Sequence, residues 1–147
     1  MEIRTLSAIE TQEIGKRIGR SAYDGLVILL TGNLGAGKTT FTQGLAQGLE
    51  IERTIASPTF TIMKNYQGRL ELNHIDAYRL ENLHQDLGFE ERIGTQGVTV
   101  IEWPDFIKEL WPDTYIQISF EYIDEFTRNI VLQAKGYNEE HLLENLK

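Results

Sequence analysis

The feature that most constrains this chain is a short apolar run that leads straight into a glycine-rich loop. Residues 26–30 (LVILL) are continuously apolar, and residues 32–39 read GNLGAGKT. A run of this kind is typical of a strand that is buried on both faces at the centre of a parallel sheet. Apolar residues then recur every fourth position from 41 to 49, which predicts a helix over about 38–49. The order strand, glycine loop, helix predicts a three-layer α/β fold, the P-loop NTPase fold, with a mainly parallel sheet and helices on both faces.

The loop matches the phosphate-binding pattern G-x-x-x-x-G-K-T. Glycines permit positive φ angles, so backbone N–H groups can turn inward around a phosphate, and the following helix directs its positive N-terminus at the same point. Lys38 would reach the β- and γ-phosphates, and the Thr39 hydroxyl would bind Mg²⁺. We therefore expect ATP with Mg²⁺ to be bound by Asn33, Leu34, Gly35, Ala36, Gly37, Lys38, Thr39 and Thr40.

The remaining pattern fits one domain over residues 1–147. Ser7 to Glu10 form a capping box that begins an N-terminal helix. Pro104 is placed to serve as the first residue of a short helix. The further elements expected are strands over 61–66, 70–76 and 97–102, a helix over 82–93, an antiparallel strand pair over 115–122 and 129–134 at one edge of the sheet, and a tail helix over 138–147.

Two carboxylates end expected strands, and ligands of open α/β sheets bind at the carboxyl ends of the strands. Glu102 directly follows a buried run, so it is the better candidate to hold Mg²⁺ through water or to polarise the attacking water. Asp76 ends a less apolar strand. The alternative for both acids is capping of a following helix or pairing with an arginine. The catalytic candidates are Lys38, Asp76 and Glu102, and the metal candidates are Thr39, Asp76 and Glu102.

Four other positions allow more than one interpretation. Thr59 lies in the segment SPTF, which is either a γ-phosphate sensor or a turn. His74 fits a packed or hydrogen-bonded histidine better than a catalytic one. Trp103 fits core packing better than contact with a partner or nucleotide, and Arg128 is by default a surface residue.

The charge balance bears on the class of ligand. The net charge is −8 and the pI is about 4.9, which disfavours direct, tight binding of RNA or DNA. The chain has no cysteine, no long apolar segment and no secretory signal. We therefore expect a cytoplasmic protein that binds no membrane.

Four motifs together resemble the TsaE family. They are TGNLGAGKTT at 31–40, SPTF at 57–60, HIDAYR at 74–79 and IEWP at 101–104, in this order and at similar spacing. The first motif is shared by many proteins, whereas its combination with the last two is much more specific. The resemblance covers nearly the whole chain.

The resemblance implies a weak ATPase that works with the proteins TsaD and TsaB to make threonylcarbamoyladenosine beside the tRNA anticodon. It also implies that Thr39 and Glu102 bind Mg²⁺, that Asp76 supports turnover and that Thr59 belongs to a nucleotide-responsive switch. Two segments, around 7–11 and around 124–128 including Arg128, correspond to family segments near the base. The partners would hold the tRNA, so this chain would meet it only indirectly.

Two other functions stay open on the loop alone. A small-molecule kinase would need an acceptor site, yet no arginine-rich lid segment is evident and little chain is left to build one. A GTP-binding switch would need the guanine-reading N-K-x-D signature, which is missing. No arginine finger is evident near the loop, so we expect slow hydrolysis by the chain alone, with partner docking supplying or positioning the missing groups.

Overall fold

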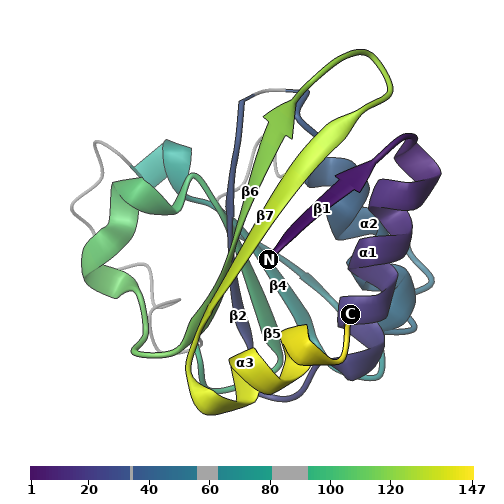
Figure 1. Ribbon diagram of the computed structural model, residues 1–147. Coiled ribbons are helices and arrows are strands. Elements are labelled where there is room, and N and C mark those ends of the chain that lie inside the picture. The colour runs from purple at the N-terminus through teal and green to yellow at the C-terminus, as the bar shows by residue number, and fades with distance from the viewer. Residues whose placement is uncertain (34, 56–62, 81–92) are drawn as a thin grey trace.

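The computed structural model describes residues 1–33, 35–55, 63–80 and 93–147. Within these residues, seven strands form one sheet in the order β1-β7-β6-β2-β5-β4-β3 (Figure 1). Neighbours from β6 through β2 and β5 to β4 are parallel, and the strands at both edges are antiparallel. The strands are β1 Glu2–Thr5, β2 Val27–Thr31, β3 Met63–Tyr66, β4 Leu72–Asp76, β5 Val98–Glu102, β6 Tyr115–Tyr122 and β7 Arg128–Lys135.

Helices cover the sheet unequally in the described residues. The helices α1 (Ala8–Ser21) and α2 (Lys38–Gly48) pack side by side on one face (Figure 1). The C-terminal helix α3 (Tyr137–Glu144) contacts β7. The opposite face carries a second apolar cluster that includes Ile107 of the 3-10 helix η2 (Pro104–Leu110). The mixed α/β fold with a parallel centre, expected from the strand–loop–helix order, is confirmed.

The N-terminal capping box is also confirmed. The Ser7 side chain accepts a hydrogen bond from the Glu10 backbone N–H at 3.1 Å. The Glu10 carboxylate returns to the backbone N–H of Leu6, at 3.2 Å, rather than to that of Ser7. The bond to Ser7 satisfies a donor that helix geometry leaves unpaired, and the bond to Leu6 fixes the residue before the N-cap, so α1 begins where the sequence predicts.

Four glycines bring α1 and α2 into backbone contact. Gly15 and Gly19 of α1 face Gly44 and Gly48 of α2. A Cβ atom on Gly44 would lie 1.9 Å from the Gln12 carbonyl oxygen, and one on Gly15 would lie 2.2 Å from that of Phe41. Only glycine fits this spacing, so the contact fixes α2, and with it the end of the glycine loop, against α1.

The sheet differs from the sequence-based expectation at its edges. The strand β1 was not expected, because it is only four residues long and two of them are exposed. It pairs antiparallel with β7, with Glu2 opposite Val131. In the expected strand pair, β6 joins the parallel part of the sheet through β2, and β7 is antiparallel to both of its neighbours, β6 and β1. At the opposite edge, β3 is antiparallel as well.

The structure describes two of the expected elements only in part. The expected helix over 82–93 lies outside the described residues except for Ile93, as do residues 61 and 62 of the expected strand. The tail helix is confirmed as α3, and Pro104 is the first residue of η2. Among the described helices, none has the length and apolarity needed to cross a membrane.

Candidate nucleotide-binding site

The glycine loop lies between the end of β2 and the start of α2, at the carboxyl end of the parallel strands. Gly32, Gly35 and Gly37 have φ angles of 144°, 80° and 111°. Residues with a side chain rarely adopt such angles, so the loop shape requires glycine at these points. Gly37 is the N-cap of α2 and supplies no side-chain cap. A helix start without a side-chain cap at its N-cap suits a phosphate, because the first helix amides point toward it.

Lys38 places a buried ammonium group inside this loop. Its Nζ donates a hydrogen bond to the Gly32 carbonyl oxygen at 2.8 Å and lies 3.8 Å from the centre of the Trp103 ring. The residue is 6% exposed. Burial lowers the pKa of Lys38, and the negative charges of Glu102 and Asp76 oppose this shift. The loop therefore holds one cation next to two carboxylates.

The two candidate acids lie side by side. Asp76 of β4 pairs in register with Glu102 of β5, at the last residue of each strand. Glu102 is buried and its Oε2 lies 2.6 Å from Nε2 of His74. Asp76 accepts a hydrogen bond from the Tyr78 backbone N–H at 3.1 Å, so it also caps the 3-10 helix η1 (Ala77–Leu80). This position agrees with both interpretations of Asp76, as an acid of the nucleotide site and as the cap of the following helix.

The donor set of this corner fits Mg²⁺. Thr39, the second residue of α2, provides a hydroxyl, and Asp76 and Glu102 provide carboxylate oxygens. In the part of the chain that the structure describes, no group of three or more His, Cys, Asp or Glu side chains could hold a metal alone. Mg²⁺ in nucleotide sites is usually held by one or two carboxylates together with phosphate oxygens, so a site completed by the nucleotide is the arrangement that these residues suit.

Arg128 contacts the glycine loop from the first residue of β7. Its Nη2 donates to the Gly35 carbonyl oxygen at 3.2 Å. Its Nη1 donates to the carbonyl oxygens of Asp124, at 2.6 Å, and Thr127, at 3.0 Å. The guanidinium also lies 4.5 Å from the Tyr122 ring centre. Arg128 is thus a half-exposed surface residue, as the default interpretation has it, and it also contacts the glycine loop, which that interpretation did not include.

Trp103 covers Lys38 instead of packing in the core. Its backbone adopts a left-handed conformation, with φ of 58°. Its ring lies 5.8 Å from that of Tyr78, which in turn lies 5.5 Å from that of Phe106. A cavity of about 340 Å³ opens beside these rings and the loop, lined by Thr31, Gly32, Asn33, Trp103, Pro104, Asp105 and Phe106. The expectation of core packing for Trp103 is thus corrected.

The structure brings most of the expected site residues together. The loop and the start of α2 contain Asn33, Gly35, Ala36, Gly37, Lys38, Thr39 and Thr40. Leu34 and Thr59 lie outside the described residues. Sequence reasoning missed the contact of His74 with Glu102. A signal was present, since His74 precedes Asp76 by two residues and therefore lies on the same face of β4.

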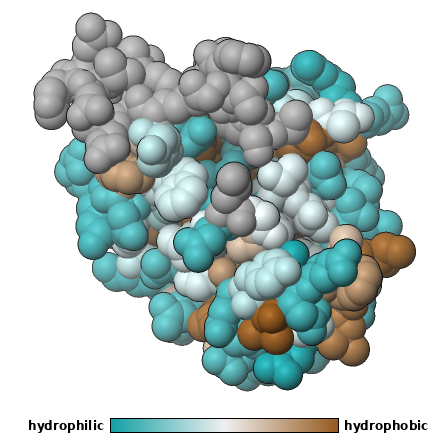
Figure 2. Space-filling view, turned by 90° about the horizontal axis from the view of Figure 1, so that it is seen from above, coloured by the Kyte–Doolittle hydropathy of each residue, from teal (hydrophilic) through white to brown (hydrophobic). Residues whose placement is uncertain are grey.

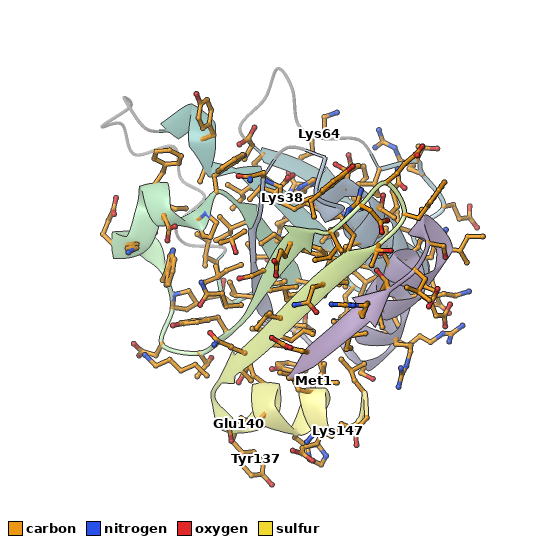
Figure 3. All side chains as sticks on the ribbon, turned by 45° about the horizontal axis from the view of Figure 1, so that its top comes forward. Met1, Lys38, Lys64, Tyr137, Glu140 and Lys147 are labelled. Atoms are coloured by element: carbon orange, nitrogen blue, oxygen red, sulfur yellow. The ribbon has the colours of Figure 1, made fainter. Side chains whose placement is uncertain are left out.

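The site occupies one end of the molecule. Lys38 lies at the opposite end of the sheet from Met1, Tyr137, Glu140 and Lys147 (Figure 3). Those four residues border a second hollow, of about 550 Å³, between β7 and α3. That hollow lies far from the loop and its carboxylates. The view from above, onto the loop end, shows a mixed surface of hydrophilic and pale residues with a few hydrophobic areas (Figure 2).

Comparison with known proteins agrees with this geometry. The family model described as "Threonylcarbamoyl adenosine biosynthesis protein TsaE" matches residues 5–130. A TsaE protein of Bacillus subtilis is 44% identical over 144 residues, which cover 97% of this chain and 91% of the relative. A TsaE protein of Treponema pallidum is 41% identical over 128 residues, covering 86% and 95%.

A solved structure shares the fold. The crystal structure of Bacillus subtilis YdiB superposes with a TM-score of 0.82 at 38% sequence identity, covering 99% of this chain and 93% of that one. The family match spans the glycine loop, both strand-end carboxylates and Arg128. The chain belongs to the TsaE family.

Proposed function

We propose that this chain binds ATP with Mg²⁺ and hydrolyses it slowly, as the nucleotide-driven component of threonylcarbamoyladenosine synthesis in tRNA, together with TsaD and TsaB. One observation carries the proposal. The buried Lys38 ammonium lies within a glycine loop at the start of α2, and the Asp76–Glu102 pair lies beside it. A cation, helix amides and two carboxylates at one point suit a metal-bound polyphosphate.

Each residue has a chemical task in this proposal. Backbone amides of the loop and Lys38 bind the phosphates, and the Thr39 hydroxyl with Glu102 holds Mg²⁺. When bound, Mg²⁺ neutralises charge on the phosphate oxygens. Asp76 and Glu102 orient the water that attacks the terminal phosphate, because they end adjacent strands at this point.

The proposal also predicts slow turnover by the chain alone. Trp103 covers the Lys38 ammonium. Arg128 is bonded to three carbonyl oxygens, so its guanidinium is held at the rim of the loop. Docking of a partner at this end would shift these groups toward the phosphates, and groups that stabilise the transition-state charge raise phosphoryl-transfer rates by about 10³–10⁵.

The test measures ATP turnover and tRNA modification with and without the two partners. Lys38→Ala should abolish nucleotide binding by calorimetry and modification in the complete mixture. Lys108→Ala is the matched control, because Lys108 is a surface lysine whose side chain is 68% exposed. If tRNA is modified at the wild-type level in the mixture that contains Lys38→Ala, the ATPase role is contradicted.

The cavity beside Trp103 favours a second candidate, a small-molecule kinase. Its volume of about 340 Å³ and its position next to Gly32 and Asn33 would suit a small acceptor. A screen of metabolites for ATP-dependent phosphorylation separates the two functions. A defined phosphorylated product at ordinary enzyme rates supports the kinase, whereas stimulation of ATP hydrolysis by TsaD and TsaB supports the ATPase.

A further inference from the structure

His74 belongs to neither the glycine loop nor the metal donor set, yet it makes a buried contact with Glu102, which is a member of that set. His74 lies on β4 and is 0% exposed, and its Nε2 lies 2.6 Å from Oε2 of Glu102 on the adjacent strand β5. The same face of β4 carries Asp76 two residues later. The imidazole therefore contacts one candidate catalytic acid and shares a strand with the other.

The proton in this contact can be assigned from chemistry. A carboxylate oxygen that carries no proton can only accept, so with Glu102 as a metal-binding or water-orienting carboxylate the donor is Nε2 of His74. The Nδ1 of a neutral imidazole is then a bare acceptor. This atom is buried and has no hydrogen-bond partner in the described structure. An unpaired buried acceptor costs free energy, and an apolar side chain of similar size would avoid that cost. Packing alone therefore does not account for a histidine here.

We propose that His74 is a positioning residue for Glu102, an inference that rests on the proposed ATPase function. The Nε2–H group fixes Oε2 and so sets the orientation of the carboxylate. The second oxygen of Glu102 is left for the metal-bound or attacking water. Carboxylates that serve metals are commonly oriented by a hydrogen bond of this kind, and removal of the orienting group costs about 10- to 100-fold in metal affinity or activity.

Two substitutions of similar polarity separate this role from a merely structural one. In His74→Gln, the amide nitrogen is the same number of bonds from Cα as Nε2 of histidine, so it can donate to Glu102. In His74→Asn, the amide nitrogen corresponds to Nδ1 and falls short of Glu102. A structural role would respond to the loss of the ring in both variants, whereas the positioning role depends on the donor that only glutamine restores.

The experiment measures kcat, KM for ATP and the Mg²⁺ concentration for half-maximal turnover, with wild-type TsaD and TsaB present. We expect His74→Asn to lower kcat by about 10- to 100-fold and to raise the Mg²⁺ requirement. Calorimetric binding of ATP without Mg²⁺ should stay as in the wild type, because Lys38 and the loop amides are unchanged. His74→Gln should recover most of the lost turnover.

Thr99→Val is the matched control. Thr99 is also buried on β5 and its Oγ1 is also without a partner among the described residues. It lies three residues before Glu102 and so on the other face of the strand. This variant should keep wild-type turnover. Thermal unfolding of all variants checks that each is folded, and nitrogen NMR of the wild-type imidazole gives the tautomer independently of any variant.

The outcomes separate the two proposals. Wild-type turnover in His74→Asn, equal losses in His74→Asn and His74→Gln, or an imidazole without a proton on Nε2 would each overturn the positioning role. If one of these outcomes is found and Glu102→Gln still loses hydrolysis, the ATPase function stands and only the positioning role of His74 is rejected. A wild-type protein that binds no Mg²⁺–ATP would overturn both.

Discussion

At the scale of single residues, Arg128 links the β6–β7 turn to the glycine loop. Its guanidinium bonds Gly35 on one side and Asp124 with Thr127 on the other. Asp124 itself accepts hydrogen bonds from the backbone N–H groups of Phe126 and Thr127, which lower the pKa of its carboxyl. The backbone of the turn is thus hydrogen-bonded to the Asp124 carboxylate, and Arg128 connects the turn to the glycine loop.

Arg128→Ala should weaken ATP binding without unfolding the protein. The loop would lose a charged hydrogen bond to Gly35, and such bonds are worth about 1–3 kcal/mol, or roughly 5- to 150-fold in affinity. Isothermal calorimetry with Mg²⁺–ATP measures the change. Arg4→Ala, an exposed arginine on β1, is the control. Equal affinity in the two variants would show that the contact with Gly35 has no bearing on the nucleotide.

Residues defined by a local pattern could be predicted, whereas residues defined by neighbouring strands could not. Lys38 and Thr39 follow from their spacing to the glycines. Glu102 and Asp76 follow from their places at strand ends. The pairing of His74 with Glu102 depends on the register between β4 and β5, and the left-handed backbone of Trp103 depends on the chain turning back over Lys38. Neither is encoded within a few residues of sequence.

At the scale of elements, the glycine contact between α1 and α2 is the tightest packing described. Glycine normally weakens a helix by about 0.5–1 kcal/mol relative to alanine. Here Gly15, Gly19, Gly44 and Gly48 all lie where a Cβ would fall within 2.4 Å of a backbone carbonyl oxygen on the partner helix. The close approach therefore outweighs the intrinsic helix preference. Both helices have this pair of glycines four residues apart, so each pair lies on one face of its helix.

Gly44→Ala should destabilise the fold, although alanine is the better helix former. Its Cβ would lie 1.9 Å from the Gln12 carbonyl oxygen, so the helices must separate. Overpacking of this kind costs about 1–3 kcal/mol or more. Urea unfolding followed by circular dichroism measures the loss. Ser21→Ala, at the exposed end of α1, should leave stability nearly unchanged. A stabilising effect of Gly44→Ala would contradict the helix contact.

The helix α3 is joined to the chain segment after α1 by a buried polar contact. The Tyr23 hydroxyl donates to Oε2 of Glu139, which is 4% exposed. Tyr23→Phe removes this donor from a buried carboxylate, at a cost of about 1–3 kcal/mol. Urea unfolding at neutral pH measures it. Tyr137→Phe is the control, because Tyr137 is 83% exposed and should tolerate the change.

The same contact predicts a pH dependence. Burial and the Glu139 carboxylate raise the pKa of Tyr23 well above its ordinary value near 10. Above about pH 10 the unfolded chain releases the Tyr23 proton while the folded chain keeps it, so the folded state binds more protons and stability falls as pH rises. The difference in unfolding free energy between wild type and Tyr23→Phe should therefore shrink above pH 10. A constant difference across that range would exclude the linkage.

Elements with a strong local pattern could be placed from the sequence, and the sheet edges could not. The strand β2, the helix α2 and the strand β5 have continuous or periodic apolar residues. The strand β1 has four residues and gains its structure only by pairing with β7. The parallel pairing of β6 with β2 is likewise a long-range choice, which a strand pattern cannot reveal.

At the scale of the whole molecule, the net charge of −8 contrasts with the local positive charge of the glycine loop. The loop presents a cation and helix amides, while the surface as a whole repels polyanions. A nucleotide with Mg²⁺ carries a reduced negative charge and can enter, whereas a tRNA presents many phosphates along its length. Under the proposed function, this charge distribution favours the nucleotide as the ligand of this chain and leaves the tRNA to be held by other proteins.

The chain alone should not retard tRNA in a gel at physiological salt. Binding of nucleic acid relies on neutralised phosphates, and this surface offers few basic groups for them. Addition of TsaD and TsaB should produce a retarded species that contains all three proteins. Tight, salt-sensitive binding of tRNA by the isolated chain would contradict the indirect role.

The backbone contact between α1 and α2 also has a mechanical consequence. Since the two backbones touch at four glycines, a tilt or slide of α1 would displace α2 and the amides at its first turn. The strand β1 leads directly into α1 and is hydrogen-bonded to β7, which begins at Arg128. A displacement of β1 would therefore be passed through α1 to α2 and to the end of the glycine loop.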